Sequence, residues 1–485
     1  MEKIYSKKKI ISSLIWKFME TIGTQGIQFI IQIILARLLL PEDFGNIALV
    51  TVFILLGNVF IQSGFNTALI QKKEADSLDF SSVFYLSLVF ASFLYIIIFF
   101  SSPMIANFYQ QPDITLILRV LSVVLFLGAF NSVQNAYIAK NMMFKKLFFS
   151  SLVAISISGS AGIIAAYLGF GIWALVLQQV LNQLLITVIL WVTVKWRPSL
   201  AFSFKRTKIL FLFGWKILAS SLLNSLYVNL RTLLIGKIYS PDILGHYNRG
   251  SQFPLLIINS INGSIQSVML PALSSYQDNT LKVKEMIKRA VMTSSFVIFP
   301  LMIGLAVIAD PLINIVLTEK WAPAVPFLQI YCLIYALRPL HTANAQAANA
   351  LGRSDIFLRV EIIRTIIGLI ILILSLPFGV FGIAWGALLH AVISTYIYIF
   401  PNTGLINYSF KSQMKDIIPA LIISILMGAL IYPINFLNVP QIATLLLQII
   451  FGALIYILLA MIFKIKSFNY LIVTIREIFN PKRTV

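Results

Sequence analysis

Lysine, threonine and glutamine side chains recur on one face of an otherwise apolar segment near the N-terminus. Lys17, Thr21, Thr24, Gln28 and Gln32 follow one another at steps of 4, 3, 4 and 4 residues. At about 100° per residue, these side chains fall within about 80° of a helix surface. An ammonium group beside hydroxyl and amide groups can bind an anion and hydrogen-bond the polar groups of a ligand. The spacing therefore predicts a hydrophilic face inside an apolar helix.

A second stripe of the same kind follows two hundred residues later. Lys216, Ser220, Asn224, Tyr227 and Arg231 are spaced 4, 4, 3 and 4 residues apart and cover a similar arc. The alternative is that these groups only hydrogen-bond neighbouring helices, as polar side chains in membranes often do. Two matching stripes, each headed by a lysine, favour a polar lumen, because polar groups in a membrane usually face a bundle interior or a wet cavity.

A third polar run, "ALRPLHTANAQAAN" at 336–349, places Arg338, His341 and Asn344 at three-residue steps. Histidine titrates near neutral pH, so His341 is a candidate for proton coupling. A neutral histidine that hydrogen-bonds within packed helices is the more frequent role, and that alternative stays open. The run is predicted to line the same polar interior as the two stripes.

Acidic residues are few within the apolar segments. Glu20 follows Lys17 by three residues, and Glu361 precedes Arg364 by three. Both acids are candidates for H+ or Na+ coupling, or form simple neutralising pairs along a helix. Basic residues outnumber them, so the predicted interior is cationic. It suits an anion better than a cationic drug, since guanidinium and ammonium groups bind phosphate oxygens well.

The elements that carry these residues are long apolar helices. The chain has 485 residues, of which 59% are hydrophobic and only 11% charged, with a mean hydropathy of +0.91. This composition predicts an all-α polytopic membrane protein. About fourteen runs are long enough to cross a bilayer. They lie near 11–40, 44–70, 80–106, 114–138, 147–168, 171–194, 209–239, 243–272, 288–310, 324–349, 356–377, 379–403, 416–434 and 441–463.

The distribution of charge sets the predicted orientation. Although the net charge is +20, the basic residues lie in short clusters that alternate with nearly uncharged loops. This alternation is typical of cytoplasmic loops and argues against nucleic acid binding. We predict that both termini are cytoplasmic. One cysteine, Cys332, and three scattered histidines predict no disulfide, metal site or cofactor.

Internal repeats divide the chain. "LARLLLPEDFG" at 35–45 matches "IGKIYSPDILG" at 235–245, each at the end of a long apolar run. We predict two six-helix lobes related by a pseudo-two-fold axis along the membrane normal, with a substrate cavity between them. The predicted lobes are 1–200 and 201–410, followed by two extra helices at 411–464 and a basic tail at 465–485. The tail is either an interfacial amphipathic helix or a simple basic extension.

Several phrases carry a family resemblance over about residues 10–465: "LARLLLPEDFGNIAL", "RTLLIGKIYSPDILGHYNRGSQFP", "VMLPALSSYQD" and "EKWAPAVPFLQIYC". They resemble the polysaccharide-exporting flippases, the O-antigen, teichuronic-acid and colanic-acid exporter branch of the multidrug/oligosaccharidyl-lipid/polysaccharide superfamily. The resemblance implies transfer of an undecaprenyl-diphosphate-linked oligosaccharide to the outer leaflet. Where many relatives have an acidic residue, this chain has Arg231, which argues against ion coupling at that position.

The sequence therefore predicts a non-enzymatic flippase of the bacterial cytoplasmic membrane that works by alternating access. The predicted partners are the lipid-linked glycan, membrane lipids and, in the pathway, a polymerase and glycosyltransferases; the protein is expected to be a monomer. The alternatives are a cation-coupled multidrug antiporter and a non-transporting scaffold. Predicted cargo-binding residues are Lys17, Thr21, Gln28, Gln32, Lys216, Asn224, Arg231, Arg338, His341 and Asn344, with Glu20 and Glu361 as ion-coupling candidates.

Overall fold

The described part of the chain is helical throughout, with no strand. A computed structural model describes residues 7–72, 75–437 and 439–479. It divides into two compact units, Met1–Gly245 and His246–Val485, which are treated separately below. Helix α9 (Pro241–Ser274) begins in the first unit and continues in the second. The predicted lobe and tail boundaries remain a prediction.

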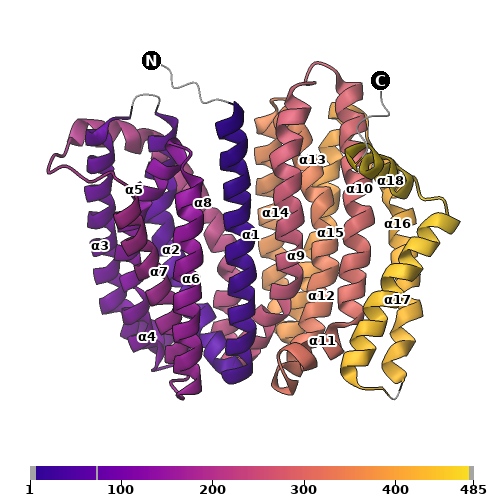
Figure 1. The fold of residues 1–485 in the computed structure, drawn as a ribbon, viewed down its shortest axis with the longest axis horizontal. Coiled ribbons are helices and arrows are strands. Elements are labelled where there is room, and N and C mark those ends of the chain that lie inside the picture. Colours follow the sequence, from indigo (N-terminus) through magenta and orange to yellow (C-terminus); the bar gives the residue numbers. More distant parts are fainter. Residues whose placement is uncertain (1–6, 73–74, 438, 480–485) are drawn as a thin grey trace. The chain divides into compact units, whose positions relative to one another are not determined.

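The first unit is a bundle of long helices (Figure 1). In this bundle α2 packs on α5 and α8, and α6 packs on α1 and α7. Aromatic residues form much of the core at one end, where Phe65, Phe80, Phe84 and Trp196 are buried together. The helices are α1 (Lys7–Leu38), α2 (Pro41–Gln71), α3 (Ser77–Tyr109), α4 (Ile114–Leu121), α5 (Val123–Lys140), α6 (Phe144–Tyr167), α7 (Ile172–Thr193) and α8 (Phe204–Ile238).

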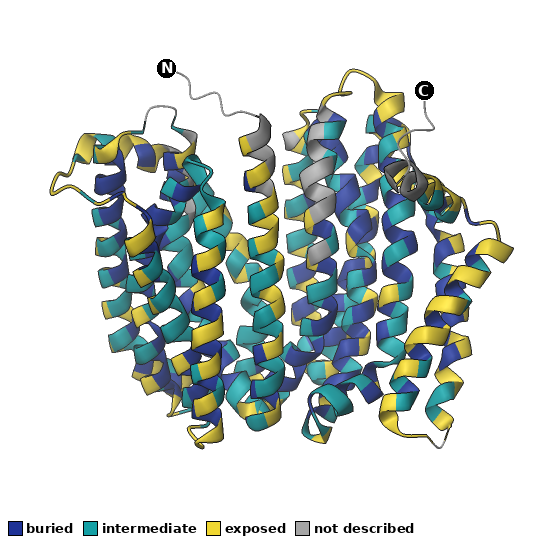
Figure 2. Cartoon of the chain, in the orientation of Figure 1, coloured by how far each residue is buried: buried dark blue, intermediate teal, exposed yellow. Residues whose placement is uncertain are grey.

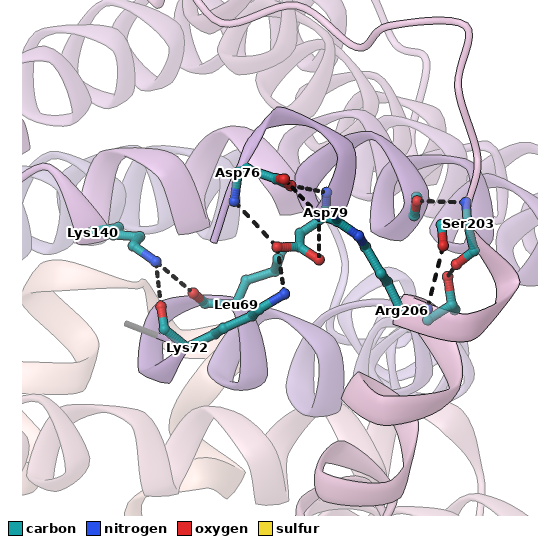
Figure 3. A network of polar contacts seen from close by, with 9 residues as sticks. Leu69, Lys72, Asp76, Asp79, Lys140, Ser203 and Arg206 are labelled. Carbon is teal, nitrogen blue, oxygen red and sulfur yellow. Dashed lines mark hydrogen bonds and ion pairs between the residues drawn. The ribbon is translucent and has the colours of Figure 1, made fainter. Parts of the chain in front are cut away.

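A network of charged groups joins the ends of α2, α3, α5 and α8 (Figure 3). The fully buried Asp79 carboxylate lies 2.6 Å from the Lys72 ammonium and 3.6 Å from the Arg206 guanidinium. Lys140 donates to the carbonyls of Leu69 and Lys72, which satisfies the end of α2. A hydrogen bond from Arg206 lowers the pKa of Asp76 to about 2. These contacts fasten the start of α8 to the first unit.

The second unit contains the rest of the helices. In it α10 packs on α12, α13 and α16, while α14 packs on α15 and α16 on α17. The helices are α10 (Thr280–Val307), α11 (Ala309–Val316), α12 (Val325–Ala336), α13 (Arg338–Ala350), α14 (Ser354–Ser375), α15 (Gly379–Ile406), α16 (Phe410–Ile431), α17 (Gln441–Ile462) and α18 (Lys466–Phe479), with short 3₁₀ turns η1 (Glu319–Ala324), η2 (Leu376–Phe378) and η3 (Tyr432–Phe436).

Many of these helices are long and apolar enough to cross a membrane. Within the described residues there are 11 such spans, or up to 12 if the bent helix α8 is included. One of the 11 is Asp355–Ile406, which contains both α14 and α15. Exposed residues run along the helices of both units (Figure 2), and many of them are large and apolar, as lipid contact requires. The all-helical membrane fold is confirmed, whereas the count of fourteen spans is not.

The two copies of the repeated proline-glycine motif touch one another within the first unit. A methyl group added at Gly45 would lie 1.8 Å from the carbonyl oxygen of Pro241, and one added at Gly245 would lie 2.1 Å from that of Pro41. Real carbon and oxygen atoms cannot approach so closely. Glycine is therefore required in both copies by close packing of the first turns of α2 and α9, and not only by the turns that precede them.

Candidate functional site: cationic and polar helix faces

Only Lys17 of the polar stripe on α1 is exposed, and the other four residues are half-buried. The Lys17 ammonium, whose side chain is 47% exposed, lies 2.6 Å from the Glu20 carboxylate. The Thr21 hydroxyl donates to the Lys17 carbonyl, and Thr24 donates to that of Glu20. Deeper along the helix, Gln28 accepts a hydrogen bond of 3.3 Å from Gln178 on α7, and Gln32 is half-buried. The stripe on α1 thus combines one exposed ammonium group with half-buried hydroxyl and amide groups.

The stripe on α8 is more exposed than the stripe on α1. Lys216, Ser220 and Asn224 are exposed, whereas Tyr227 and Arg231 are half-buried. In the described part of the chain, the buried Nε of Arg231 has no hydrogen-bond partner. A buried donor without a partner is costly, more so on a charged group. An anionic ligand would satisfy this donor.

The polar run of the second unit begins at a break between two helices. Helix α12 ends at Ala336 and α13 begins at Arg338. Pro339 has no N–H for the helix ladder, so the carbonyl one turn earlier is released. Arg338 is exposed, and its guanidinium lies 5.6 Å from the centre of the Tyr335 ring. A broken span with a cation at the break provides polar groups inside an apolar segment.

His341 and Glu361 belong to one chain of contacts between α13, α14 and α15. The His341 ring nitrogen lies 2.8 Å from the Thr395 hydroxyl. The ring also stacks on Tyr398, with centres 5.0 Å apart. The Tyr398 hydroxyl donates to Glu361, which also forms an ion pair of 2.7 Å with Arg364. The structure therefore brings His341 and Glu361, predicted separately, into one cluster.

Asn344 lies in a buried amide network. Its amide nitrogen donates to Gln413 at 2.9 Å, and its side-chain oxygen accepts from Gln413 and from Asn402 at 2.8 and 2.6 Å. Asn344 is 2% exposed, so its groups are engaged in joining α13, α15 and α16. A small pocket adjoins the network and is lined by Asn344, Tyr398, Asn402 and mainly apolar neighbours.

Sequence reasoning did not identify Asn402 or Gln413. Each is a single amide residue in an apolar run, without the helical spacing that marked the stripes. Their pairing with Asn344 spans 58 and 69 residues of sequence. Only a tertiary contact could reveal such a network. Among the described residues, no group of three or more histidine, cysteine or acidic side chains lies close enough together to hold a metal ion.

The predicted site residues thus form two sets. The first unit carries Lys17, Thr21, Gln28, Gln32, Lys216, Asn224, Arg231 and Glu20, and the second carries Arg338, His341, Asn344 and Glu361. Within each set, cations are accessible in the apolar segments. The assignment of these residues to cargo binding stays a prediction.

Comparison with known protein families identifies the family of this chain. Residues 34–326, more than half of the chain, match the family model described as "Polysaccharide biosynthesis protein". The chain belongs to this family. The family predicted from the sequence phrases is confirmed.

Individual members of the polysaccharide biosynthesis family resemble the chain over most of their length. The teichuronic acid biosynthesis protein TuaB of Bacillus subtilis is 25% identical over 88% of this chain and 89% of its own. The lipopolysaccharide biosynthesis protein WzxC of Escherichia coli is 24% identical over 87% of this chain and 88% of its own. Both relatives therefore match most of this chain and not a single segment of it.

Solved structures show the same fold at low identity. The lipid II flippase MurJ in an inward closed conformation matches with a TM-score of 0.74 at 16% identity, covering 94% of this chain and 99% of its own. An inward-facing multidrug resistance transporter of the MATE family matches with a TM-score of 0.61 at 17% identity, covering 79% and 95%. This family member therefore has the fold of the superfamily that the sequence predicted.

Proposed function

We propose that this protein moves a lipid-diphosphate-linked oligosaccharide from the inner to the outer leaflet of a bacterial cytoplasmic membrane by alternating access. Relatives over nearly the full length are named for teichuronic acid and lipopolysaccharide biosynthesis. A further relative, from Rhizobium meliloti, is a succinoglycan biosynthesis transport protein. The shared theme of these names is the assembly of surface polysaccharide, and the third names transport.

The observation that best supports the proposal is the buried Nε of Arg231 on α8. Arg231 holds a buried Nε without a hydrogen-bond partner within the described residues. Cations inside a membrane are costly and are retained where they act. A diphosphate supplies anionic oxygens that match the forked guanidinium donors. We assign Lys216 and Arg231 of the first unit to anionic groups of the cargo, and we assign Arg338 of the second unit the same role. Lys17 already has Glu20 as its partner.

Amide and hydroxyl groups of the stripes serve the glycan in this proposal. Thr21, Gln28, Gln32 and Asn224 are exposed or half-buried, so they can exchange hydrogen bonds with sugar hydroxyls. Asn344 is left out of this set because its amide is engaged with Gln413 and Asn402. His341 contacts Thr395 and Tyr398 instead of open space, so we assign it to packing.

The driving force does not require a coupling ion. Outward movement of an anion from a negative cell interior is favoured by about 2.3 kcal/mol per charge at 100 mV. The two acids of the predicted coupling set already have basic partners, since Glu20 pairs with Lys17 and Glu361 with Arg364. We propose that transport draws on the membrane potential, and that Glu20 and Glu361 neutralise their neighbours.

The experiment is transport of lipid-linked glycan by purified protein in liposomes. Arg231→Gln and Arg338→Gln keep hydrogen-bonding capacity and remove the charge, so we expect transport to fall by about tenfold or more. Lys195→Gln, at an exposed position between α7 and α8, is the matched control. Unchanged transport by both arginine variants at wild-type protein levels would refute the assignment.

The same assay separates the alternative functions. An antiporter should move a cationic drug against an imposed H+ or Na+ gradient, and a scaffold should move nothing while it co-purifies with a polymerase. Each result would replace the flippase proposal. Glycan movement that responds to the membrane potential alone would support it.

A further inference from the structure

Helix α18 begins just after α17, where the exposed apolar surface of α17 ends. That surface continues to Ile462 and Phe463, which are 70% and 56% exposed, and is formed by Ile442, Leu446, Ile449, Ile450, Leu454, Leu458, Ile462 and Phe463. At Lys464 the backbone turns with φ of 47°. Exposed apolar surface on a spanning helix contacts hydrocarbon, so its end marks the edge of the hydrocarbon region. Lys464 and Lys466 follow directly and therefore lie at the level of the lipid headgroups.

One side of α18 is held against α10. The Phe468 ring lies 6.1 Å from that of Phe296, and the Arg289 guanidinium lies 5.8 Å from the centre of the Tyr470 ring. Ser467 is buried at this contact. In contrast, Tyr470 and Val473 are 43% and 51% exposed. The helix thus keeps apolar surface open next to the end of the lipid-facing face of α17.

Five exposed cations lie on α18 and on helices of the same unit. Arg289 is on α10, Lys411 and Lys415 are in the first two turns of α16, and Lys464 and Lys466 are at the junction of α17 and α18; together they are here called the basic collar. The starts of α10 and α16 lie at the same end of the unit, because Lys288 forms an ion pair of 3.0 Å with Asp416. Helix α17 follows α16 through the short turn η3, packs on α16 and returns to that end. Asp416, the acidic residue of the first two turns of α16, is paired with Lys288, which is not part of the collar.

We propose that α18 is an interfacial helix that rests on the membrane surface, and that the basic collar binds anionic phospholipid headgroups of the surrounding bilayer. Basic residues beside an open apolar face are the combination that holds a helix at a membrane surface. Each lysine or arginine close to an anionic leaflet adds to the attraction. A lipid partner fits better than a protein partner, because α18 begins only three residues after the apolar exposed surface of α17 ends.

A spin label on α18 tests this placement in the full chain. Val473→Cys provides an exposed attachment point, and the native Cys332 is fully buried, so the label is specific. The labelled protein is reconstituted in vesicles of phosphatidylcholine alone or with added phosphatidylglycerol. Collision of the label with oxygen and with an aqueous nickel chelate then reports its depth. We expect lower nickel exposure in the vesicles that contain phosphatidylglycerol.

Charge variants decide whether the collar is responsible. Lys464→Gln combined with Lys466→Gln should lose the phosphatidylglycerol-dependent part of the protection, whereas Lys195→Gln should keep it. High salt should have the same effect as the double variant, because exposed charges more than about 3 Å apart are largely screened from one another at 1 M salt. Nickel exposure that is equal in both lipids, or unaltered in the double variant, would overturn the proposal. The measurement reports helix position and not transport, so its outcome is independent of the proposed function.

Discussion

Two polar regions of this protein look alike in sequence and differ in three dimensions. The stripe on α8 and the run on α13 each place amides and cations at helical spacing in an apolar segment. On α8, Asn224 is exposed and Arg231 holds a buried, unsatisfied Nε. On α13, Asn344 is 2% exposed and shares hydrogen bonds with Gln413 and Asn402. The comparison shows that one pattern can serve a ligand-accessible face or a structural joint.

The difference follows from what lies opposite each helix. Amides that face one another across a helix contact form hydrogen bonds with each other. If one of them is removed, the others are left buried without a partner, which costs free energy. An amide facing open space exchanges its hydrogen bonds with water or with a ligand. The two asparagines, Asn224 and Asn344, therefore form a matched pair for mutagenesis.

The largest effect on stability is expected from Asn344→Leu. The substitution leaves buried amides of Gln413 and Asn402 without their partner, so the free energy of unfolding should fall by about 2–5 kcal/mol. Thermal unfolding in detergent and the amount of protein in membranes measure this loss. A variant as stable as the wild type would mean that the network contributes no net stability, and the contrast with α8 would disappear.

The same substitution on α8, Asn224→Leu, should have a different result. Asn224 is exposed, so stability should change by no more than about 0.5 kcal/mol. Transport of lipid-linked glycan should fall severalfold, because a glycan-binding amide is lost from the proposed cargo path. Unfolding and liposome transport are measured on the same preparation. Full transport at normal stability would remove Asn224 from the proposed ligand set.

The smallest effect on stability is expected from Asp76→Asn, which removes one charge of the exposed ion pair between Asp76 and Arg206. Arg206 lowers the pKa of Asp76 to about 2, below its ordinary value of 3.8. The carboxylate therefore stabilises the folded state above pH 3.8, and this contribution is lost as the pH falls towards 2. The pair is exposed and screened by solvent.

Asp76→Asn should accordingly lower the melting temperature only slightly near neutral pH. Its unfolding should also lack the part of the acid destabilisation that the wild type shows between pH 4 and pH 2, where Asp76 becomes protonated. Melting curves of both proteins across this range provide the measurement. A large loss at neutral pH would instead assign Asp76 a structural weight like that of the buried network.

The sequence by itself determined the membrane class, the helical segments and the family. Apolar runs long enough to span a bilayer leave few alternatives, because every backbone polar group in lipid needs an internal partner. Phrases such as "LARLLLPEDFG" identified the family through local residue order. The helical spacing of Lys216, Asn224 and Arg231 also predicts that these side chains share one face of a helix.

Only the tertiary structure decided which polar groups are engaged. The contact of Asn344 with Gln413, and the close approach of Gly45 to Pro241, join residues far apart in the chain. Helical periodicity specifies which side chains share a face but not what that face meets. The burial of Asn344, and the exposure of Asn224, depend on the neighbouring helix, and that is a property of the packed molecule.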